Sequence, residues 1–140
     1  MNTVVDTALW LLGGALLSVI IARTYDFVFF RKFDLQEAIL DGNLSASIFF
    51  GLMALGVSLI VFAVLMSPSA SNVIEDVVLT ILWSFGTTFI ATIVFYICDR
   101  ILLPKVKLEE EIKRGNVAAG VFSGLIYLLV SIIAVSIILT

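Results

Sequence analysis

Four long apolar runs constrain the fold of this chain more than any other feature of its sequence. They extend over residues 4–22, 44–66, 77–98 and 117–139. Each run has about 19 to 23 residues, and an α-helix needs about 20 residues to cross the hydrocarbon core of a bilayer. Because lipid offers the backbone no hydrogen-bond partners, spanning segments of this kind must be helical. The sequence therefore predicts an all-α membrane protein with four transmembrane helices.

The composition agrees with a bilayer as the solvent of the chain. Of its 140 residues, 61% are hydrophobic and 14% are charged, whereas a soluble domain is about half apolar and about a quarter charged. The length suits a single membrane domain. The net charge of -3 provides no basic excess that would attract nucleic acid.

Residue types that usually carry catalysis or bind metals are scarce. The chain has no His, which is the commonest general base and metal ligand at neutral pH. Its single cysteine, Cys98, excludes an intramolecular disulfide and a multi-cysteine metal site. No motif places a nucleophile beside a base. We therefore expect no enzymatic activity, no cofactor and no metal site.

The basic residues are confined to two segments, residues 23–43 and 99–116. The eight cations are Arg23, Arg31, Lys32, Arg100, Lys105, Lys107, Lys113 and Arg114. The segment between the second and third apolar runs, residues 67–76, has two acids and no cation. Because Lys and Arg are enriched in cytoplasmic loops, we expect both basic segments in the cytoplasm and both termini in the periplasm.

The chain also contains an internal duplication. When it is shifted against itself by 73 residues, residues 1–67 align with residues 74–140 without a gap, and 22 of 67 positions are identical. The identities include Asp26 with Asp99 and one Trp in each half. The alignment predicts two structural repeats within one membrane domain.

Each predicted repeat contributes two spans, so both repeats enter the membrane in the same orientation. The expected spans are residues ~4–30 and ~44–66 in the first repeat and ~77–103 and ~117–139 in the second. Parallel repeats are related by a pseudo-two-fold axis along the membrane normal. The predicted fold is a four-helix bundle with this internal symmetry.

A short charged segment precedes the second span of each repeat, at residues 34–41 and 107–114. Each carries two apolar residues at i,i+4 spacing, namely Leu35 and Ile39 in the first and Leu108 and Ile112 in the second. This spacing predicts short amphipathic helices whose apolar stripe rests on the cytoplasmic surface of the membrane.

A Gly-Asn pair follows each of these short helices. Gly42 and Gly115 suit the left-handed residue that ends a helix. Asn43 and Asn116 suit the position that caps the N-terminus of the next span.

The second of these junctions continues as Gly-Asn-Val-Ala-Ala-Gly at residues 115–120, and the first as the weaker copy Gly-Asn-Leu-Ser-Ala-Ser at residues 42–47. With the short acidic helix before it and the Gly-containing span after it, this pattern resembles the bacterial YjfL-like inner-membrane family (domain of unknown function 350). The family is itself built as two such repeats. The resemblance implies a bacterial inner-membrane protein without an established activity. Genes of this family often lie beside genes for membrane-coating and channel-like proteins, so the resemblance also suggests a role in the envelope.

Two acids occupy equivalent positions at the cytoplasmic ends of the first and third spans. Asp26 lies one helical turn after Arg23, and Asp99 adjoins Arg100. One interpretation is a symmetric pair of carboxylates at the mouth of a cation or proton path, because ionisable groups within membranes often mark such paths. The other is a local ion pair at the level of the headgroups.

The third span carries a run of hydroxyl side chains that the first span mostly lacks. They are Thr80, Ser84, Thr87, Thr88 and Thr92. They form either a stripe that faces water or a set of hydroxyls bonded to carbonyls one turn back or to a neighbouring helix.

Small residues recur at equivalent places in the second and fourth spans. Ser47 and Gly51 have the same four-residue separation as Gly120 and Gly124. Such pairs allow close approach of helix backbones. They predict helix packing, either within one chain or between chains.

Two functions remain open at this point. The first is an oligomeric ion channel or transport-related protein, in which a homo-oligomer places the Asp26 and Asp99 positions around a path between subunits. The alternative is a membrane scaffold, whose charged helices recruit a soluble cytoplasmic partner through Glu109, Glu110 and Glu111 together with Lys113 and Arg114. In both cases the partners include the lipid bilayer and further copies of the chain, in a dimer or a higher oligomer.

Overall fold

The computed structural model of the protein describes residues 3–30, 34–67 and 72–140, and all regular secondary structure in these segments is helical. The helices are α1 (Thr3–Leu9), η1 (Trp10–Gly14), α2 (Ala15–Phe29), α3 (Leu35–Leu40), α4 (Leu44–Met66), α5 (Val73–Ile97), η2 (Cys98–Leu102), α6 (Leu108–Lys113) and α7 (Val117–Ile138). The segments η1 and η2 are single wide turns of π-helix within longer helices.

Within the described residues, four continuous helices are long and apolar enough to cross a membrane. They are Val4–Val28, Leu44–Met66, Val73–Leu102 and Val117–Ile138. The predicted all-α fold with four transmembrane helices is therefore confirmed. Arg31 and Lys32, two of the eight cations, lie outside the described residues.

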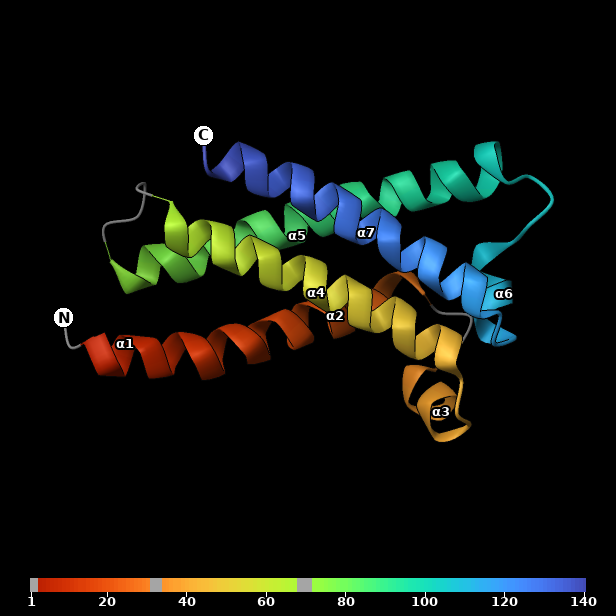
Figure 1. The fold of residues 1–140 in the computed structure, drawn as a ribbon, viewed down its shortest axis with the longest axis horizontal. Helices are drawn as coiled ribbons and strands as arrows, with labels where there is room; N and C mark the ends of the chain where they lie inside the picture. The colour runs from red at the N-terminus through yellow and green to blue at the C-terminus, as the bar shows by residue number, and fades with distance from the viewer. Residues whose placement is uncertain (1–2, 31–33, 68–71) are drawn as a thin grey trace.

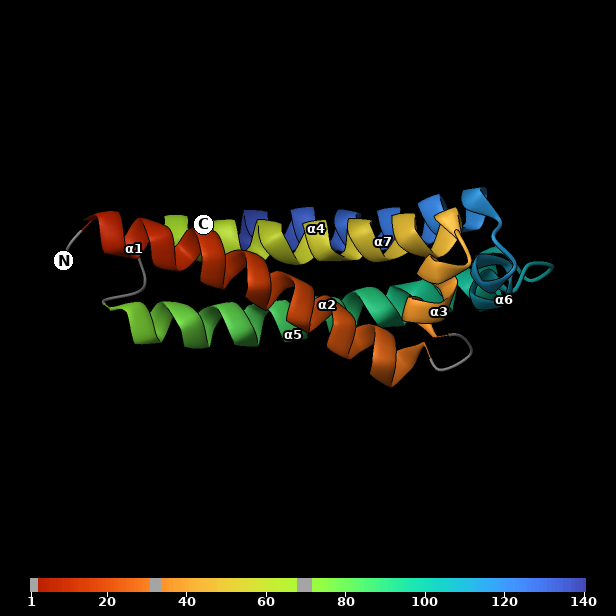
Figure 2. The same ribbon diagram turned by 90° about the horizontal axis from the view of Figure 1, so that it is seen from below.

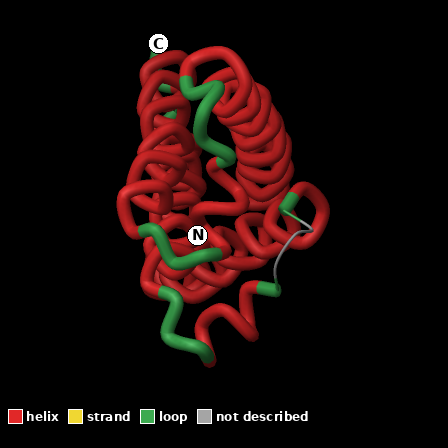
Figure 3. The backbone as a smooth tube through the Cα atoms, turned by 90° about the vertical axis from the view of Figure 1, so that its right-hand side faces the viewer, coloured by secondary structure: helices red, strands yellow, loops and turns green. Residues whose placement is uncertain are grey.

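The long helices lie side by side and alternate in direction (Figure 1). The start of α1, the end of α4, the start of α5 and the C-terminus lie at one end of the bundle, which we call the terminal end. The short helices α3 and α6 lie at the other end, called the short-helix end, and Figure 3 looks along the bundle from there. Basic residues of η2, of α6 and of the segment between them therefore gather at one end.

Helix α4 lies at the centre of the bundle. It packs most extensively against α7, and it also contacts α2 and α5. In Figure 2 the α1–α2 helix begins at the level of α4 and α7 and descends past them towards α5. Its first half exposes large apolar side chains such as Leu11 and Leu12, which are 69% and 70% accessible. No described residue of the chain covers these two side chains.

Helix α5 begins four residues earlier than the apolar run predicts. Asn72 caps it by accepting a hydrogen bond from the backbone N–H of Glu75 at 3.0 Å. Glu75 and Asp76 then lie in the first turn, where negative charge interacts favourably with the helix dipole. The cap at Asn72 thus allows the helix to begin within a polar segment that the apolar run does not include.

The apolar stripes of the short helices differ from the expectation. Leu108 and Ile112 of α6 and Leu35 of α3 are almost fully buried and belong to the main hydrophobic core of the protein. Ile39 alone of the four remains exposed. The prediction that the stripes rest on the membrane surface is therefore wrong for three of the four residues. The reason is that both short helices fold back over the bundle, where protein covers their apolar face.

Four aromatic rings fill the core near the short-helix end. They are Phe30, which ends α2, Phe49 of α4, Phe95 of α5 and Tyr127 of α7. Each ring lies 5.0 to 6.4 Å from the other three, mostly edge to face. Aromatic pairs prefer this geometry. We call these residues the aromatic cluster.

The packing of the two halves is only partly equivalent. Helix α2 packs on α4 much as α5 packs on α7, but α4 also contacts α5, whereas α2 and α7 have at most marginal contact within the described residues. Phe49 is buried, while Phe122 at the equivalent position is 36% exposed. The pseudo-two-fold symmetry therefore stays a prediction.

Candidate functional site

Asp26 and Arg23 form a local pair on α2. The Nη1 atom of Arg23 donates to Oδ2 of Asp26 at 2.5 Å. Asp26 is 2% exposed, whereas the side chain of Arg23 is 35% exposed. Residues three apart lie on the same face of a helix, so α2 itself positions both groups. This is the geometry of the local ion pair and not of a carboxylate at an open mouth.

Asp99 has a different partner. Its Oδ1 accepts a hydrogen bond from the backbone N–H of Leu108 at 2.7 Å and so satisfies the first turn of α6. Within the segments that the structure describes, no ion pair joins Asp99 to Arg100. The two equivalent acids are therefore not equivalent in their contacts.

The residues before the short helices explain this difference. Asp34 caps α3 by accepting from the backbone N–H groups of Gln36 and Glu37 at 2.7 and 3.4 Å. The corresponding residue before α6 is Lys107, which has no acceptor atom in its side chain. Asp99 supplies a carboxylate from η2, but it accepts from the N–H of the first residue of α6, whereas Asp34 accepts from those of the second and third residues of α3.

Both Gly-Asn junctions have the backbone that the sequence indicates. Gly42 and Gly115 adopt φ angles of 72° and 85°, a region that glycine enters without steric cost. Asn43 accepts from the backbone N–H of Ala46 at 3.0 Å. In the same way, Asn116 accepts from that of Ala119 at 3.4 Å.

The first junction also joins the two halves of the chain. The Nδ2 atom of Asn43 donates to the carbonyl oxygens of Ile112 and Lys113 at 3.0 and 3.1 Å, at the end of α6. Ser45 donates to the carbonyl oxygen of Asn116 at 2.6 Å. Asn116 itself donates to Glu111 within its own half. The contact from Asn43 depends on the tertiary fold, and the repeat pattern gives no sign of it.

One of the two small-residue pairs packs within the chain. A Cβ atom at Gly120 would overlap the backbone of Ser45, and one at Gly124 would overlap the side chain of Leu52. Helices α4 and α7 therefore touch through these glycines. At Gly51 a Cβ atom would meet nothing within 4 Å, so this residue faces outward. Sequence reasoning missed Gly56, where a Cβ atom would lie 2.7 Å from Oγ of Ser131.

The hydroxyl side chains of α5 face the interior of the protein. Thr80, Ser84, Thr87, Thr88 and Thr92 are all at most 4% exposed, and we call them the hydroxyl row. Thr88 donates to the carbonyl oxygen of Ser84 at 2.7 Å and Thr92 to that of Thr88 at 2.8 Å. The hydroxyl of Thr92 also lies 2.9 Å from that of Tyr127.

Three buried hydroxyl oxygens have no hydrogen-bond partner in the described structure. They belong to Thr80 and Ser84 of the row and to Ser123 of α7. A buried hydroxyl without a partner costs about 1 to 3 kcal/mol. The interior of the bundle thus contains hydroxyl groups whose hydrogen bonds are not satisfied by the packing of the described helices. Ser123 escaped sequence reasoning because it is an isolated Ser in an apolar span.

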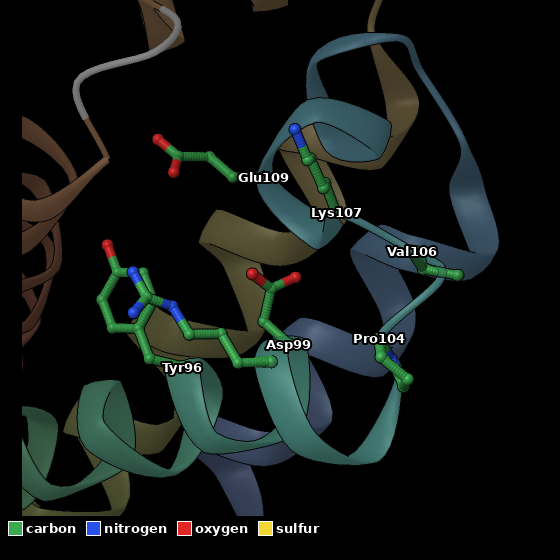
Figure 4. Close-up of a pocket in the computed structure, with 7 residues that line it drawn as sticks. Tyr96, Asp99, Pro104, Val106, Lys107 and Glu109 are labelled. Atoms are coloured by element: carbon green, nitrogen blue, oxygen red, sulfur yellow. The ribbon is translucent and has the colours of Figure 1, made fainter.

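A pocket of about 510 Å³ lies between the end of α5, η2 and α6 (Figure 4). Its lining consists of Tyr96, Asp99, Arg100, Pro104, Val106, Lys107 and Glu109. Glu109 is only 8% exposed, so it does not belong to the exposed charged surface that the scaffold hypothesis assigns to Glu109, Glu110 and Glu111. The turn of α6 that buries Leu108 also turns Glu109 inward. Across the described residues, no cluster of three or more His, Cys, Asp or Glu side chains is arranged to hold a metal ion.

Four membrane-length helices with two short helices at one end define a small polytopic membrane protein of the all-α class. Residues 1–138 match the family described as Domain of Unknown Function (DUF350), and the chain belongs to this family. It is also similar to a "UPF0719 transmembrane protein" of Aquifex aeolicus (strain VF5), with 30% identity over 111 residues. The match covers 78% of this chain and 39% of the relative, well under half of its length. No solved structure matches the chain.

Proposed function

We propose that the protein is transport-related and carries a small ion or a proton along the hydroxyl row inside its helix bundle. The supporting observation is a row of five buried hydroxyl side chains on one membrane helix, two of which have no partner within the described residues. Polar groups that face the interior of a membrane bundle commonly line the paths of ions and substrates. Water or a hydrated ion satisfies such hydroxyls more readily than lipid or apolar side chains do.

The proposed path lies within each chain and not between subunits. Asp26 and the hydroxyl row face the core of one chain, so copies around a common axis would not bring them together. We therefore propose a homo-oligomer in which each protomer carries its own path. The duplication, with its pseudo-two-fold axis along the membrane normal, would then contribute to folding and assembly. It would contribute less to the path itself.

The row covers much of the membrane and ends at the aromatic cluster. From Thr80 to Thr92 the helix rises about 18 Å at 1.5 Å per residue, compared with a hydrocarbon core of about 30 Å. The hydroxyl of Tyr127 meets Thr92, and the rings of the cluster close the core beyond it. In this proposal the cluster is the closed gate, and rotation of its side chains opens the path.

The charge distribution supports an orientation in a bacterial inner membrane. The described basic residues that follow α5 gather at the short-helix end, and the positive-inside rule places such an end in the cytoplasm. Both termini would then be periplasmic. The proposed path opens outward at Thr80, and its gate lies on the cytoplasmic side.

The test is flux through purified protein in liposomes that enclose a pH-sensitive or cation-sensitive dye. Ser84→Ala with Thr88→Val should lower the flux about thirtyfold, because two hydrogen bonds to the permeating ion or water are lost and each is worth about 1 kcal/mol. The matched control is Thr24→Val, because Thr24 makes the same bond to a carbonyl one turn back but on an exposed face. Absence of flux in the wild type, or an equal loss in the control, would refute the proposal.

A specific observation also favours the scaffold as a second candidate. Helix α6 is held at both ends, by Asp99 at Leu108 and by Asn43 at Ile112 and Lys113. It therefore presents the charged side chains of Glu110 and Glu111 from a fixed position. Reversal of these two charges should remove a soluble partner in a pull-down, whereas Glu37→Lys on α3 should not. An unchanged set of partners would count against a scaffold.

A further inference from the structure

An acidic residue continues the hydroxyl row at the terminal end of the bundle. Asp76 lies in the first turn of α5, four residues before Thr80 and eight before Ser84. At about 100° per residue, these three residues and Thr87 fall within an arc of about 80° around the helix. Asp76 therefore lies on the same side of α5 as the first hydroxyls of the row.

The exposure of the side chains in this turn agrees with that placement. Asp76 is half-buried, whereas its neighbours Ile74 and Glu75 are exposed. One and two turns further along, Thr80 and Ser84 are both 0% exposed. Asp76 thus lies where the buried side of α5 meets the exterior.

No Lys or Arg neutralises Asp76 within the part of the chain that the structure describes. Both residue types are absent from residues 1–22 and 44–98, and none of the ion pairs between described residues involves Asp76. Asp6 and Glu75 add further negative charge at the terminal end. Charge of a single sign raises the local concentration of counter-ions. Cations should therefore gather at this end of α5, and anions should be repelled.

The two hydroxyls of the row that lie nearest to Asp76 are the two without a partner. Oγ1 of Thr80 and Oγ of Ser84 form no hydrogen bond within the described structure. By contrast, Thr88 and Thr92 donate to carbonyl oxygens one turn back. Carboxylate and other oxygen atoms are the ligands that hard cations prefer. Unsatisfied oxygen atoms thus begin one turn from a carboxylate that no cation of the protein neutralises.

The spacing of these groups allows one ion to contact Asp76 and Thr80 together. Side chains four residues apart on a helix have Cβ atoms about 5 to 6 Å apart, and hard cations lie about 2.0 to 2.6 Å from their oxygen ligands. Ser84 lies about 6 Å beyond Thr80 along the helix axis. Ser84 therefore offers the next position along the row and not a third ligand for the same ion.

The position of α5 in a bilayer places this pair of ligands near water. The continuous helix Val73–Leu102 has 30 residues, which corresponds to about 45 Å at 1.5 Å per residue. The hydrocarbon core is only about 30 Å thick, so the first turn of the helix lies at the level of the headgroups. An ion bound at Asp76 therefore keeps part of its hydration shell.

We propose that Asp76 and Thr80 bind a partly hydrated monovalent metal cation, Na⁺ or K⁺, at the terminal end of the hydroxyl row. The carboxylate and the hydroxyl each supply an oxygen ligand, and water supplies the others. One carboxylate balances one positive charge, whereas Ca²⁺ takes about six to eight oxygen ligands, commonly from several carboxylates. The inference rests on the proposed function for passage along the row, and it names a metal cation and not a proton as the substrate.

Glu75 provides a matched control for the charge of Asp76. Both acids lie in the first turn of α5, where negative charge interacts favourably with the helix dipole. Asp76→Asn and Glu75→Gln therefore remove the same charge from the same turn, but only Asp76 lies on the side of the hydroxyl row. A difference between the two variants reports the site and not the dipole.

Binding is tested by thermal unfolding of the full chain in detergent, in NaCl, KCl or choline chloride at equal concentration. A ligand that binds only the folded protein raises its Tm. Na⁺ or K⁺ should raise the Tm of the wild type and of Glu75→Gln above the value in choline chloride, but not that of Asp76→Asn or Thr80→Val. Each variant is compared with itself, so a general loss of stability does not affect the result. An equal shift in Asp76→Asn, or no shift in the wild type with either metal cation, would overturn the proposal.

Flux through liposomes relates the site to the path. Na⁺ or K⁺ should cross and choline and Cl⁻ should not. Asp76→Asn should lower the cation flux about tenfold, because a neutral amide attracts a cation less strongly than a carboxylate does, and Asp76→Glu should restore most of it. Glu75→Gln should lower the flux less than about twofold, and an equal loss in this control would mean that surface charge and not the site is responsible.

The same measurement separates this inference from the proposed function. Proton flux without flux of a metal cation would overturn the inference and leave the proposed function intact. If no ion crosses, the proposed function fails, and the shift in Tm alone decides whether Asp76 and Thr80 bind a cation.

Discussion

At the scale of single residues, the two halves of the chain give identical side chains different tasks. Asp26 pairs with Arg23, whereas its counterpart Asp99 bonds to the backbone of Leu108. One substitution accounts for the difference, because Asp34 caps α3 but Lys107, at the same place before α6, has no acceptor. A difference at one residue has thus changed the role of another that lies eight residues earlier in the sequence.

This arrangement predicts that Asp99 stabilises α6. Asp99→Ala should lower the free energy of unfolding by about 1 kcal/mol, the usual cost of removing a capping side chain. Adding Lys107→Asp should restore the loss, because it recreates the local cap that α3 has. Denaturant titration of the single and double variants in micelles measures both effects. If the double variant is no more stable than Asp99→Ala alone, Asp99 does not act as a cap of α6.

At the scale of helices, the sequence predicts the features that depend on residues close in the chain. It does not predict the features that depend on contacts between helices. The four spans follow from apolar length, and the Gly-Asn junctions follow from the φ preference of glycine and the capping ability of Asn. The partners of Asn43 at the end of α6 and the burial of Glu109 depend on how α6 docks on α4. The sequence predicts the hydroxyl row as a pattern but not its direction, because a membrane helix can turn such a row either towards water or towards a neighbouring helix.

The contact between α4 and α7 gives a matched pair of substitutions. Gly120→Ala should destabilise the protein by about 1 to 3 kcal/mol, because a Cβ atom there overlaps the backbone of Ser45 and forces the helices apart. Gly51→Ala, at the outward-facing glycine of the other small-residue pair, should change stability by less than about 0.5 kcal/mol. Thermal unfolding in detergent compares the two directly. Equal effects would mean that the close approach does not determine stability.

At the scale of the whole molecule, the closed core and the hydroxyl row have opposite consequences for transport. The row supplies polar groups across part of the membrane, while the aromatic cluster fills the remaining core. In the proposed function, these features are reconciled by a path that is open only part of the time. This proposed path requires one side chain of the cluster to move, and we choose Phe30 because it lies at the C-terminal end of α2 and its ring contacts the other three.

The proposed gate makes a prediction about Phe30. Phe30→Leu, which introduces the residue found at the equivalent position 103, removes three ring contacts worth about 0.5 to 1.5 kcal/mol each. If the cluster is a gate, flux into liposomes should increase several-fold. Phe27→Leu is the control, because Phe27 is 74% exposed on the same helix. A decrease or no change in the Phe30 variant would separate the cluster from any gate.

The orientation of the molecule is tested by the side from which each end reacts with a thiol reagent. Cys98 is half-buried, so it is replaced by Ala and a single Cys is introduced at Lys105 or at Thr140, which lie in exposed positions at opposite ends of the bundle. An impermeant maleimide added to intact spheroplasts should label Thr140→Cys but not Lys105→Cys, because the positive-inside rule places the short-helix end in the cytoplasm. Both variants should be labelled in permeabilised cells, which controls for the reactivity of each Cys.

Labelling of Lys105→Cys alone would mean that the protein has the opposite orientation, with the aromatic cluster on the periplasmic side. Labelling of both in intact spheroplasts would contradict the four-span arrangement, because 105 and 140 are separated by a single membrane helix, α7.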